Sequence, residues 1–430
     1  MLFSINFRVG LGGNLFMNNK NIRYNIDDHH HGLFIKEARL RKEYRISDLA
    51  EGVCSPSYLS KIEAGDTTPS LDIFEHLAER LDIRFPAEQQ GSLTHTFRQI
   101  IYNSQLHEID NYLLTASLHH YELQLGRFFQ AVLLKQSEKA LALRNLIDQF
   151  SHHFNDEEQQ FYALFSGICS FMHYEWEKGK KHFKKSLDLM FRLNIDDPYL
   201  YFQLAQYYFH TQNVSLGFAF LERAIAEFKI LYAKDWVFDC GIIKCREYLR
   251  NNEVENAENE LLALQSINMT NQESVVWSDI YSLQGMIFDK KCQFNQAETY
   301  FNKSVQMRGG VVKEDCLVEA IKFYYSHQNT SKMMKMFEQL DIKTLSKRNK
   351  ILVDFYYLKI TNIELEEFEF FLKKEALPYA IKTLNARDVT LYTKELTKIC
   401  RDNLRHKKVA EAYYKWEQFR ENLESNGVIR

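Results

Sequence analysis

Four stretches between residues 161 and 307 share one pattern of small and large side chains, repeated at intervals of 38, 40 and 40 residues. In each stretch a small residue is followed 12 positions later by a second one, and a large apolar residue comes four positions after that. The positions are Gly167, Gly179 and Phe183; Ala205, Gly217 and Leu221; Cys245, Ala257 and Leu261; and Gly285, Ala297 and Phe301. Small residues let two antiparallel helices approach closely, and the large residue fills the space to the next pair. The pattern therefore predicts a stack of helical hairpins.

The hairpins resemble a tetratricopeptide array with lengthened loops, since the tetratricopeptide period is about 34 residues. Weaker units are predicted on both sides, at residues 95–150, 313–342, 348–378 and 388–424. The last unit contains KKVAEAYYKWEQFRENLE, which is amphipathic and charged, as a capping helix should be. We expect a tetratricopeptide-like repeat domain over residues 95–424.

Composition favours an all-α fold class. The 430 residues include only 5 Pro and 16 Gly, and 45% are hydrophobic, a balance typical of long helices around a core. The net charge of -3 excludes an overall field that would draw the whole chain to nucleic acid or to a membrane. Seven cysteines without a C-x-x-C pair indicate reduced thiols in the cytoplasm, with neither disulfides nor a metal site. No apolar run reaches the roughly 20 residues that a membrane-spanning helix needs.

The N-terminal part has a different pattern. Residues 1–31 end in a polar stretch with three histidines, which we interpret as a flexible lead-in. Short amphipathic helices follow from residue 32. In CSPSYLSKIEAG, residues 54–65, Ser55 can cap a helix, Pro56 fits its first turn and Gly65 can end it in the left-handed conformation. Ser70 is predicted to cap the next helix, and we expect a compact helical domain over residues 32–86.

The stretch LAEGVCSPSYLSKIEAG, followed by PSLDIFEHLAERL, resembles an XRE-type helix-turn-helix domain over roughly residues 32–85. Its tight turn, LAEGVCSPSYLS, is one residue shorter than in most of that superfamily and is similar to the turn of peptide-sensing regulators of the Rap/NprR/PlcR/PrgX group. The order of the two domains is closest to that of NprR and PlcR. The resemblance implies a cytoplasmic, homodimeric transcription regulator of the quorum-sensing type, whose partners are double-stranded DNA and a short signalling peptide. It implies no cofactor and no membrane partner.

In such a domain the N-terminal residues of the recognition helix lie along the major groove of DNA. Ser55, Ser57 and Tyr58 are therefore predicted to meet base edges or phosphates, and Lys61 is predicted to reach a phosphate. Arg45 is a further candidate for a phosphate contact. Leu59 and Ile62 are expected to face inward.

Two departures from the family pattern bear on DNA binding. Arg45 and Ile46 stand where the family usually has Thr and Gln, so either Arg45 supplies a charged contact or Ile46 weakens the binding. Residues 33–85 carry eight Lys and Arg against ten Asp and Glu, a net charge of -2 that is unusual for a DNA-binding module. Most of the basic residues, however, fall between residues 36 and 45. The family pattern also implies an internal ion pair between Arg39 and Glu63.

A curved array of helical hairpins presents its first helices on a concave face that suits an extended peptide. On the repeat alignment, polar and aromatic side chains that can hold a peptide backbone or its carboxylate are expected on this face. These peptide-site candidates are Gln206, His210, Arg246, Arg250, Asp279, Ser282, Asp289, Lys322 and Tyr325.

Two other functions stay open at this stage. The repeat groove can instead bind a response regulator or another protein, with a weakened DNA-binding domain. A phosphatase activity is known in the resembled group, but no Gln or acidic residue can be assigned to it. The chain has no Walker, Rossmann, zincin or G-x-S-x-G motif, so we do not expect an enzyme and assign no catalytic residue.

Overall fold

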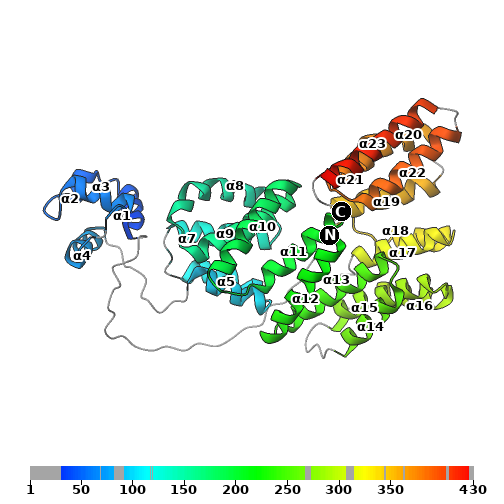
Figure 1. Cartoon of the computed structure of the whole chain (residues 1–430), viewed down its shortest axis with the longest axis horizontal. Helices are drawn as coiled ribbons and strands as arrows, with labels where there is room; N and C mark the ends of the chain where they lie inside the picture. The colour runs from blue at the N-terminus through cyan, green and yellow to red at the C-terminus, as the bar shows by residue number, and fades with distance from the viewer. Residues whose placement is uncertain are drawn as a thin grey trace. The chain divides into compact units, whose positions relative to one another are not determined.

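The computed structural model describes residues 31–67, 69–81, 92–116, 118, 120–266, 273–306, 314–342, 345–361, 364–402 and 406–425. Every regular element in these ranges is a helix, which confirms the predicted all-α fold class (Figure 1). The predicted lead-in lies outside the described residues, apart from His31. The chain divides into two compact units, one ending at Asp196 and the other beginning at Asp197, so the division falls inside the predicted repeat domain.

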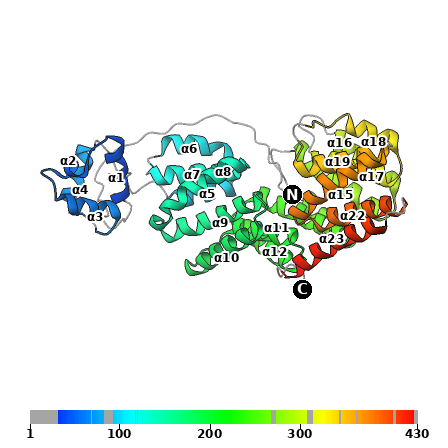
Figure 2. The same cartoon turned by 90° about the horizontal axis from the view of Figure 1, so that it is seen from above.

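The first unit begins with four short helices that form the helix-turn-helix domain (Figure 2). They are α1 (His31–Arg41), α2 (Ile46–Ala50), α3 (Pro56–Ala64) and α4 (Leu71–Arg80). The buried core of this domain consists of Ile35, Ala38, Leu49, Ala50, Leu59, Ile62, Phe74, Leu77 and Leu81. Leu59 and Ile62 therefore face inward, as the sequence predicted.

The sequence predicted that the Ser70 side chain caps α4, and the structure does not show this capping hydrogen bond. Ser70 has the extended backbone of an N-cap, with φ -63° and ψ 153°, but its hydroxyl accepts no hydrogen bond from α4. The sequence located the start of the helix correctly, but it does not fix the rotamer of the hydroxyl.

A cap that the sequence did not reveal lies at α2, where the Arg80 guanidinium donates to the carbonyl of Leu49 at 3.1 Å. This bond satisfies a carbonyl that a helix end leaves without a partner.

The rest of both units consists of helices arranged mostly as antiparallel pairs. In the first unit they are α5 (Leu93–Tyr102), η1 (Leu106–Glu108), α6 (Ile109–Thr115), α7 (His120–Leu133), α8 (Ser137–Ile147), η2 (Asp148–His153), α9 (Asp156–Met172) and α10 (Trp176–Arg192). In the second unit they are α11 (Pro198–His210), α12 (Val214–Ile230), α13 (Lys234–Arg250), α14 (Val254–Gln265), α15 (Glu273–Lys290), α16 (Phe294–Gln306), α17 (Glu314–Ser326), α18 (Thr330–Phe337), α19 (Lys347–Ile360), α20 (Leu365–Phe371), η3 (Leu372–Ala376), α21 (Leu377–Lys382), α22 (Ala386–Asp402) and α23 (His406–Ser425).

The small residues of the repeat permit close packing, as predicted. All twelve positions of the four-repeat pattern are buried. A Cβ at Gly167 would lie 2.7 Å from the Phe183 ring, and one at Gly285 would lie 3.0 Å from the Phe301 ring. The large residue of each of these two repeats thus packs on the backbone of its own first helix.

The turn inside each hairpin also repeats. In five hairpins one residue takes the left-handed conformation although it is not glycine; these residues are Tyr174, Gln212, Asn252, Cys292 and Gln328, with φ between 58° and 65°. The next N–H then reaches back to a carbonyl of the last helical turn, as from Gln293 to Phe288 at 2.9 Å. This arrangement satisfies carbonyls that the helix end leaves unpaired.

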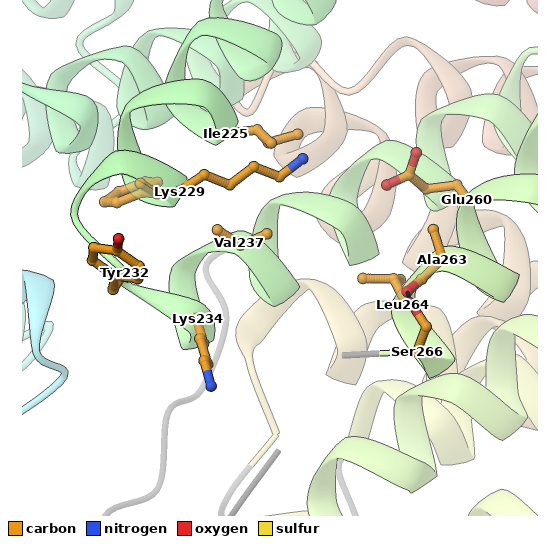
Figure 3. A pocket seen from close by; sticks show the side chains of 10 residues that line it. Ile225, Lys229, Tyr232, Lys234, Val237, Glu260, Ala263, Leu264 and Ser266 are labelled. Atoms are coloured by element: carbon orange, nitrogen blue, oxygen red, sulfur yellow. Dashed lines mark hydrogen bonds between the residues drawn. The ribbon is translucent and has the colours of Figure 1, made fainter. Parts of the chain in front are cut away.

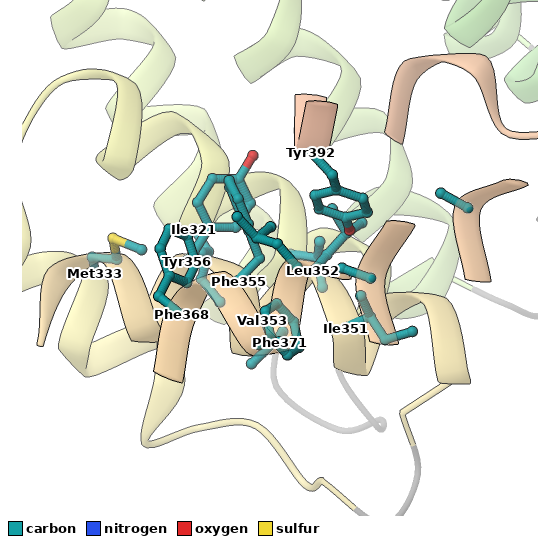
Figure 4. Packing of buried hydrophobic residues seen from close by; sticks show 14 of the residues in the cluster. Ile321, Met333, Ile351, Leu352, Val353, Phe355, Tyr356, Phe368, Phe371 and Tyr392 are labelled. Atoms are coloured by element: carbon teal, nitrogen blue, oxygen red, sulfur yellow. The ribbon is translucent and has the colours of Figure 1, made fainter. Parts of the chain in front are cut away.

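The core of the C-terminal repeats is aromatic (Figure 4). Phe355 lies at its centre, with ring centroids 5.3 Å from Tyr392 and 5.8 Å from Phe368. Beside this core, η3 is a π-helical turn that joins α20 to α21 just before Pro378. Proline has no N–H, and its ring clashes with the carbonyl four residues earlier, so a regular α-helix is disfavoured there.

Candidate DNA interface and candidate ligand groove

The ends of α3 are fixed by the residues that the sequence singled out. The Ser55 hydroxyl accepts a hydrogen bond from the backbone N–H of Tyr58 at 3.1 Å. Pro56 occupies the first turn, and Gly65 ends the helix with φ 78°. These predicted caps are confirmed, and they set the N-terminus of α3 in one conformation.

The side chains predicted to contact DNA lie on the outer face of this domain. Ser55, Ser57 and Lys61 are exposed on α3 or at its cap, whereas Tyr58 is half-buried against the core. Ser60 shares the exposed surface and was not singled out from the sequence. The arrangement leaves one face of α3 available to the major groove while the other face is held by the core.

The ion pair implied by the family pattern is present. Arg39 donates from Nε to Glu63 Oε1 at 2.6 Å and from Nη2 to Oε2 at 2.9 Å. Its remaining Nη1 donates to the carbonyl of Tyr44 at 2.9 Å. The bonds to Glu63 raise the pKa of Arg39 above its usual value. Arg39 therefore holds α1 against α3 and is not available to DNA.

The two departures from the family pattern have different surroundings. Arg45 is exposed and precedes α2. Ile46 is half-buried and packs against the core of the domain. A side chain in that place adds to packing and has no group that can bind a phosphate, so Arg45 is the polar candidate at this end of α2.

In the second unit, three of the peptide-site candidates line one cavity of about 410 Å³. They are Arg250 from the end of α13, Asp289 from α15 and Lys322 from α17. Apolar side chains from the same helices and from α16 complete part of the wall; they are Leu249, Met286, Phe301 and Phe323. The repeat alignment thus brought together residues from three successive hairpins.

Three other candidates lie deeper than the sequence suggested. Arg246, Asp279 and Ser282 are only 7%, 2% and 2% exposed. Arg246 donates to the Asp279 carboxylate at 3.0 Å, which joins α13 to α15. The repeat alignment predicted these residues on the concave face, but helical periodicity does not reveal how deeply the next repeat covers them. In this structure they support the groove and do not line its surface.

The remaining candidates lie elsewhere on the first helices. Gln206 and His210 are half-buried in α11, and the His210 Nε2–H donates to the backbone carbonyl of Thr383. Burial, with nearby Arg348 and Arg250, lowers the pKa of His210 to about 3, so its ring is neutral at neutral pH. Tyr325 packs against Tyr356 with ring centroids 4.9 Å apart.

Charged pairs link successive first helices of the second unit. Arg348 of α19 forms two bonds to Asp388 of α22, at 2.8 and 3.1 Å. Asn349 donates to Asp315 of α17 at 2.7 Å. Burial acts to raise the pKa of Asp315, but Arg246 and Asn349 outweigh it and hold that pKa below its usual value. Charges in this unit therefore act mainly between repeats.

The sequence did not single out Arg387, which also lines the cavity. It lies in the first turn of α22, far along the chain from Arg250. Spacing within one repeat gives no signal for such a residue, because it reaches the cavity through the curvature of several repeats. Lys290 and Glu319 complete the charged lining.

A second hollow, of about 440 Å³, lies among α12, α13 and α14 and is mostly apolar (Figure 3). Phe228, Val237 and Leu264 contribute to its wall. At its edge Tyr232 is 86% exposed, and the preceding Ile230 and Leu231 are 68% and 45% exposed. Large exposed apolar side chains of this kind mark surfaces that bind other proteins.

Among the described residues there is no group of His, Cys, Asp or Glu side chains that could hold a metal ion. None of the helices that the structure describes is long and apolar enough to cross a membrane.

Known proteins are similar to this chain both in its N-terminal domain and over most of its length. Residues 35–86 match the helix-turn-helix family. The chain is 24% identical over 410 residues to the transcriptional activator NprA of Geobacillus stearothermophilus, an alignment that covers 87% of this chain and 99% of that protein.

Solved structures share the fold. The apo form of the quorum sensor NprR from B. thuringiensis aligns with a TM-score of 0.56 at 16% identity, covering 76% of this chain and 95% of NprR. NprR in complex with its cognate peptide NprX gives 0.57 at 15% identity, over 77% and 95%. A Rap protein complexed with competence and sporulation factor gives 0.56 at 13% identity, over 77% and 98%. The resemblance to this group that the sequence predicted is confirmed.

Proposed function

We propose that this chain is a DNA-binding transcription regulator whose repeat groove senses a short signalling peptide. The geometry of α3 carries the first half of the proposal. Ser57 and Lys61 are exposed, whereas Leu59 and Ile62 on the opposite face are buried in the core. A recognition helix needs this division, because its outer face enters the major groove. Similarity to a transcriptional activator over nearly its whole length supports a regulatory and not a catalytic role.

The groove supports the second half. Arg250, Asp289 and Lys322 come from three hairpins and line one cavity with apolar walls. Mixed polar and apolar lining suits a peptide, whose backbone needs hydrogen-bond partners and whose side chains need pockets. Structures of similar fold include a quorum sensor with its cognate peptide. The protein would act in the cytoplasm and needs no cofactor for this role.

A homodimer is part of the proposal. A single small domain contacts few phosphates, and a second domain raises the affinity by binding a second half-site. The exposed Ile230, Leu231 and Tyr232 beside the apolar hollow offer a surface for a second copy. Light scattering of the full chain tests this: replacing Tyr232 with Lys should convert a dimer to a monomer if this surface forms the contact, and a persisting dimer would exclude the surface.

The DNA-binding half can be tested by selecting random duplexes with the full chain. The wild type should enrich a motif made of two half-sites, and a Ser57→Ala, Lys61→Ala double variant should not enrich it. A Lys335→Ala variant, which removes an exposed charge from α18, is the matched control and should behave as the wild type. Enrichment of the same motif by the double variant would contradict the assignment of α3.

A second candidate function is a protein-interaction module that binds a response regulator through the groove. The net charge of -2 over residues 33–85 and the apolar Ile46 favour this alternative. The salt dependence of DNA binding separates the two functions. A DNA-binding protein loses affinity steeply as salt rises, with a slope of about -0.9 for each phosphate contacted. A slope near zero would favour the interaction module.

A further inference from the structure

The cavity lined by Arg250 carries an unusual balance of charge. Its lining includes four cations and two carboxylates; these are Arg250, Lys290, Lys322 and Arg387, with Asp289 and Glu319. Apolar side chains line the same cavity. A volume of about 410 Å³ is near the lower end of the ~300–1,000 Å³ of small-ligand pockets, so the cavity suits one end of a peptide and not its whole length.

Both carboxylates of the lining already have partners. Glu319 accepts a bond from Lys322 at 2.8 Å. Asp289 lies 2.8 Å from the Nε2 atom of His327. Burial acts to raise the pKa of Glu319, but Lys322 outweighs it and holds this pKa below its usual value. The lining therefore keeps two more cations than carboxylates, although Glu247, just outside it, also pairs with Arg250.

Arg387 is the least favourably placed of the four cations. It lies in the first turn of α22, whose N-terminus carries partial positive charge and so disfavours a cation. Asp388 in the same turn is bound by Arg348, and Arg250 is bound by Glu247. Arg387 is exposed, but partial desolvation by the side chains around it and the nearby Arg250 lower its pKa below its usual value. A bound anion would relieve this repulsion and would also meet the start of α22.

We propose that the cavity binds a carboxylate of the sensed peptide, either its free C-terminus or an acidic side chain, between Arg250 and Arg387. This inference rests on the proposed function, because it names the chemistry by which the groove selects its peptide. Guanidinium groups bind carboxylates through paired N–H donors, which fixes orientation as well as charge. The neighbouring Met286 and Phe323 then receive an apolar side chain of the same end of the peptide.

The bound carboxylate would also link two helices of the second unit that lie far apart in the sequence. Arg250 ends α13, whereas Arg387 begins α22. One hairpin earlier, the His210 bond from α11 to the Thr383 carbonyl already links the start of this unit to the segment just before α22. A bound carboxylate would add a second link, between α13 and α22, so the peptide would stabilise the packing of these repeats on one another.

The test uses the full chain and two pools of random heptapeptides, one with free C-termini and one with amidated C-termini. Retained peptides are sequenced by mass spectrometry. The wild type should retain peptides that carry a free C-terminus or Asp or Glu at a fixed position, and Arg387→Gln should lower their retention about tenfold or more, as expected for a lost charge-assisted bond. Arg401→Gln, which removes an exposed charge from the other end of α22, is the matched control and should retain them.

The outcomes separate the two claims. If amidation abolishes selection, the C-terminus is the bound carboxylate; if a fixed acidic residue is enriched in both pools, a side chain is. Retention of peptides without preference for either would overturn this inference and leave the proposed function standing, whereas retention of no peptide at all would overturn both. Succinate should raise the melting temperature of the wild type above that in sodium chloride of equal ionic strength, and should not do so for Arg387→Gln. An equal effect on both proteins would also overturn the inference.

Discussion

The helix-turn-helix domain and the ligand groove use charge in opposite ways. Among the described residues of the domain, the buried pair of Arg39 and Glu63 holds two helices together, and the basic residues predicted to contact DNA lie on the surface. In the second unit, which holds the groove, pairs such as Arg246 with Asp279 and Arg348 with Asp388 join successive repeats. Local sequence therefore encodes the first site, and the curvature of many repeats assembles the second. The predictions below test this contrast.

The largest effect is expected in the domain. Glu63→Ala leaves the buried Arg39 guanidinium without its carboxylate, and breaking a buried ion pair costs about 3–5 kcal/mol. Hydrogen exchange of the full chain should show loss of protection in α1 and α3, together with loss of DNA binding. Glu79→Ala, at an exposed site of α4, should leave both unchanged. Full protection in the Glu63 variant would show that the pair is not essential to the domain.

In the second unit the corresponding test adds a methyl group at a position where two helices pack closely. A Cβ at Gly217 would lie 2.5 Å from the Phe209 ring, so Gly217→Ala forces α11 and α12 apart. Overpacking of this kind costs about 1–3 kcal/mol, measured as a lower midpoint of urea unfolding. Ala219→Ser, at an exposed position of the same helix, is the control. An unchanged midpoint for Gly217→Ala would mean that the small residue is not needed for helix approach.

Lowering the pH should reduce the free energy of unfolding of the second unit, because His210 is half-buried there in its neutral form. Burial lowers the pKa of His210 in the folded state to about 3, below the value of about 6.5 in the unfolded chain. The unfolded chain therefore binds the proton first, so the stabilisation is complete above about pH 6.5 and falls by up to about 1.4 kcal/mol per pH unit below it. Urea unfolding between pH 7 and pH 5 should show this loss, and His210→Gln should reduce it. An equal loss in the variant would place the titration elsewhere.

Lys61 offers a smaller and purely electrostatic effect. If its ammonium contacts one phosphate, Lys61→Gln should make the slope of log affinity against log salt shallower by about 0.9. Fluorescence anisotropy with a selected duplex measures this slope. Lys335→Gln should leave it unaltered, and an unaltered slope in the Lys61 variant would remove this residue from the interface.

The smallest predicted effect is a gain in stability. Cys292 holds the left-handed conformation with φ 59° in the turn between α15 and α16. Glycine adopts this conformation without the steric cost of about 1 kcal/mol that other residues carry, so Cys292→Gly should raise the free energy of unfolding by up to about 1 kcal/mol. Cys292→Ser retains the cost and serves as the control. A destabilised glycine variant would show that the turn is not strained.

The contrast explains what the sequence could predict. Ser55, Gly65 and the inward faces of Leu59 and Ile62 follow from local rules of capping and periodicity, and the structure agrees with them. The Arg39 pair came from the family pattern, since nothing in the spacing of 24 residues specifies it. Local rules therefore predict the capping and the buried face of α3, but not the rotamer of Ser70, the Arg39 pair or the Arg80 bond to Leu49.

The groove was predictable only in part. Period and helix faces predicted Arg250, Asp289 and Lys322 on one face, and the three line one cavity because equivalent positions of stacked hairpins lie side by side. Burial of Arg246 and Asp279 depends on how closely the next repeat packs, which one repeat does not encode. Arg387 depends on the curvature summed over several repeats, so no local pattern could have revealed it.

We propose that the two sites are coupled, so that a peptide in the groove alters DNA binding by α3. The most direct test is the dissociation constant of a selected DNA duplex with and without a peptide retained by the wild type. Allosteric coupling of about 1–3 kcal/mol predicts a change of roughly 5- to 150-fold, in either direction. Identical dissociation constants under saturating peptide would contradict the account.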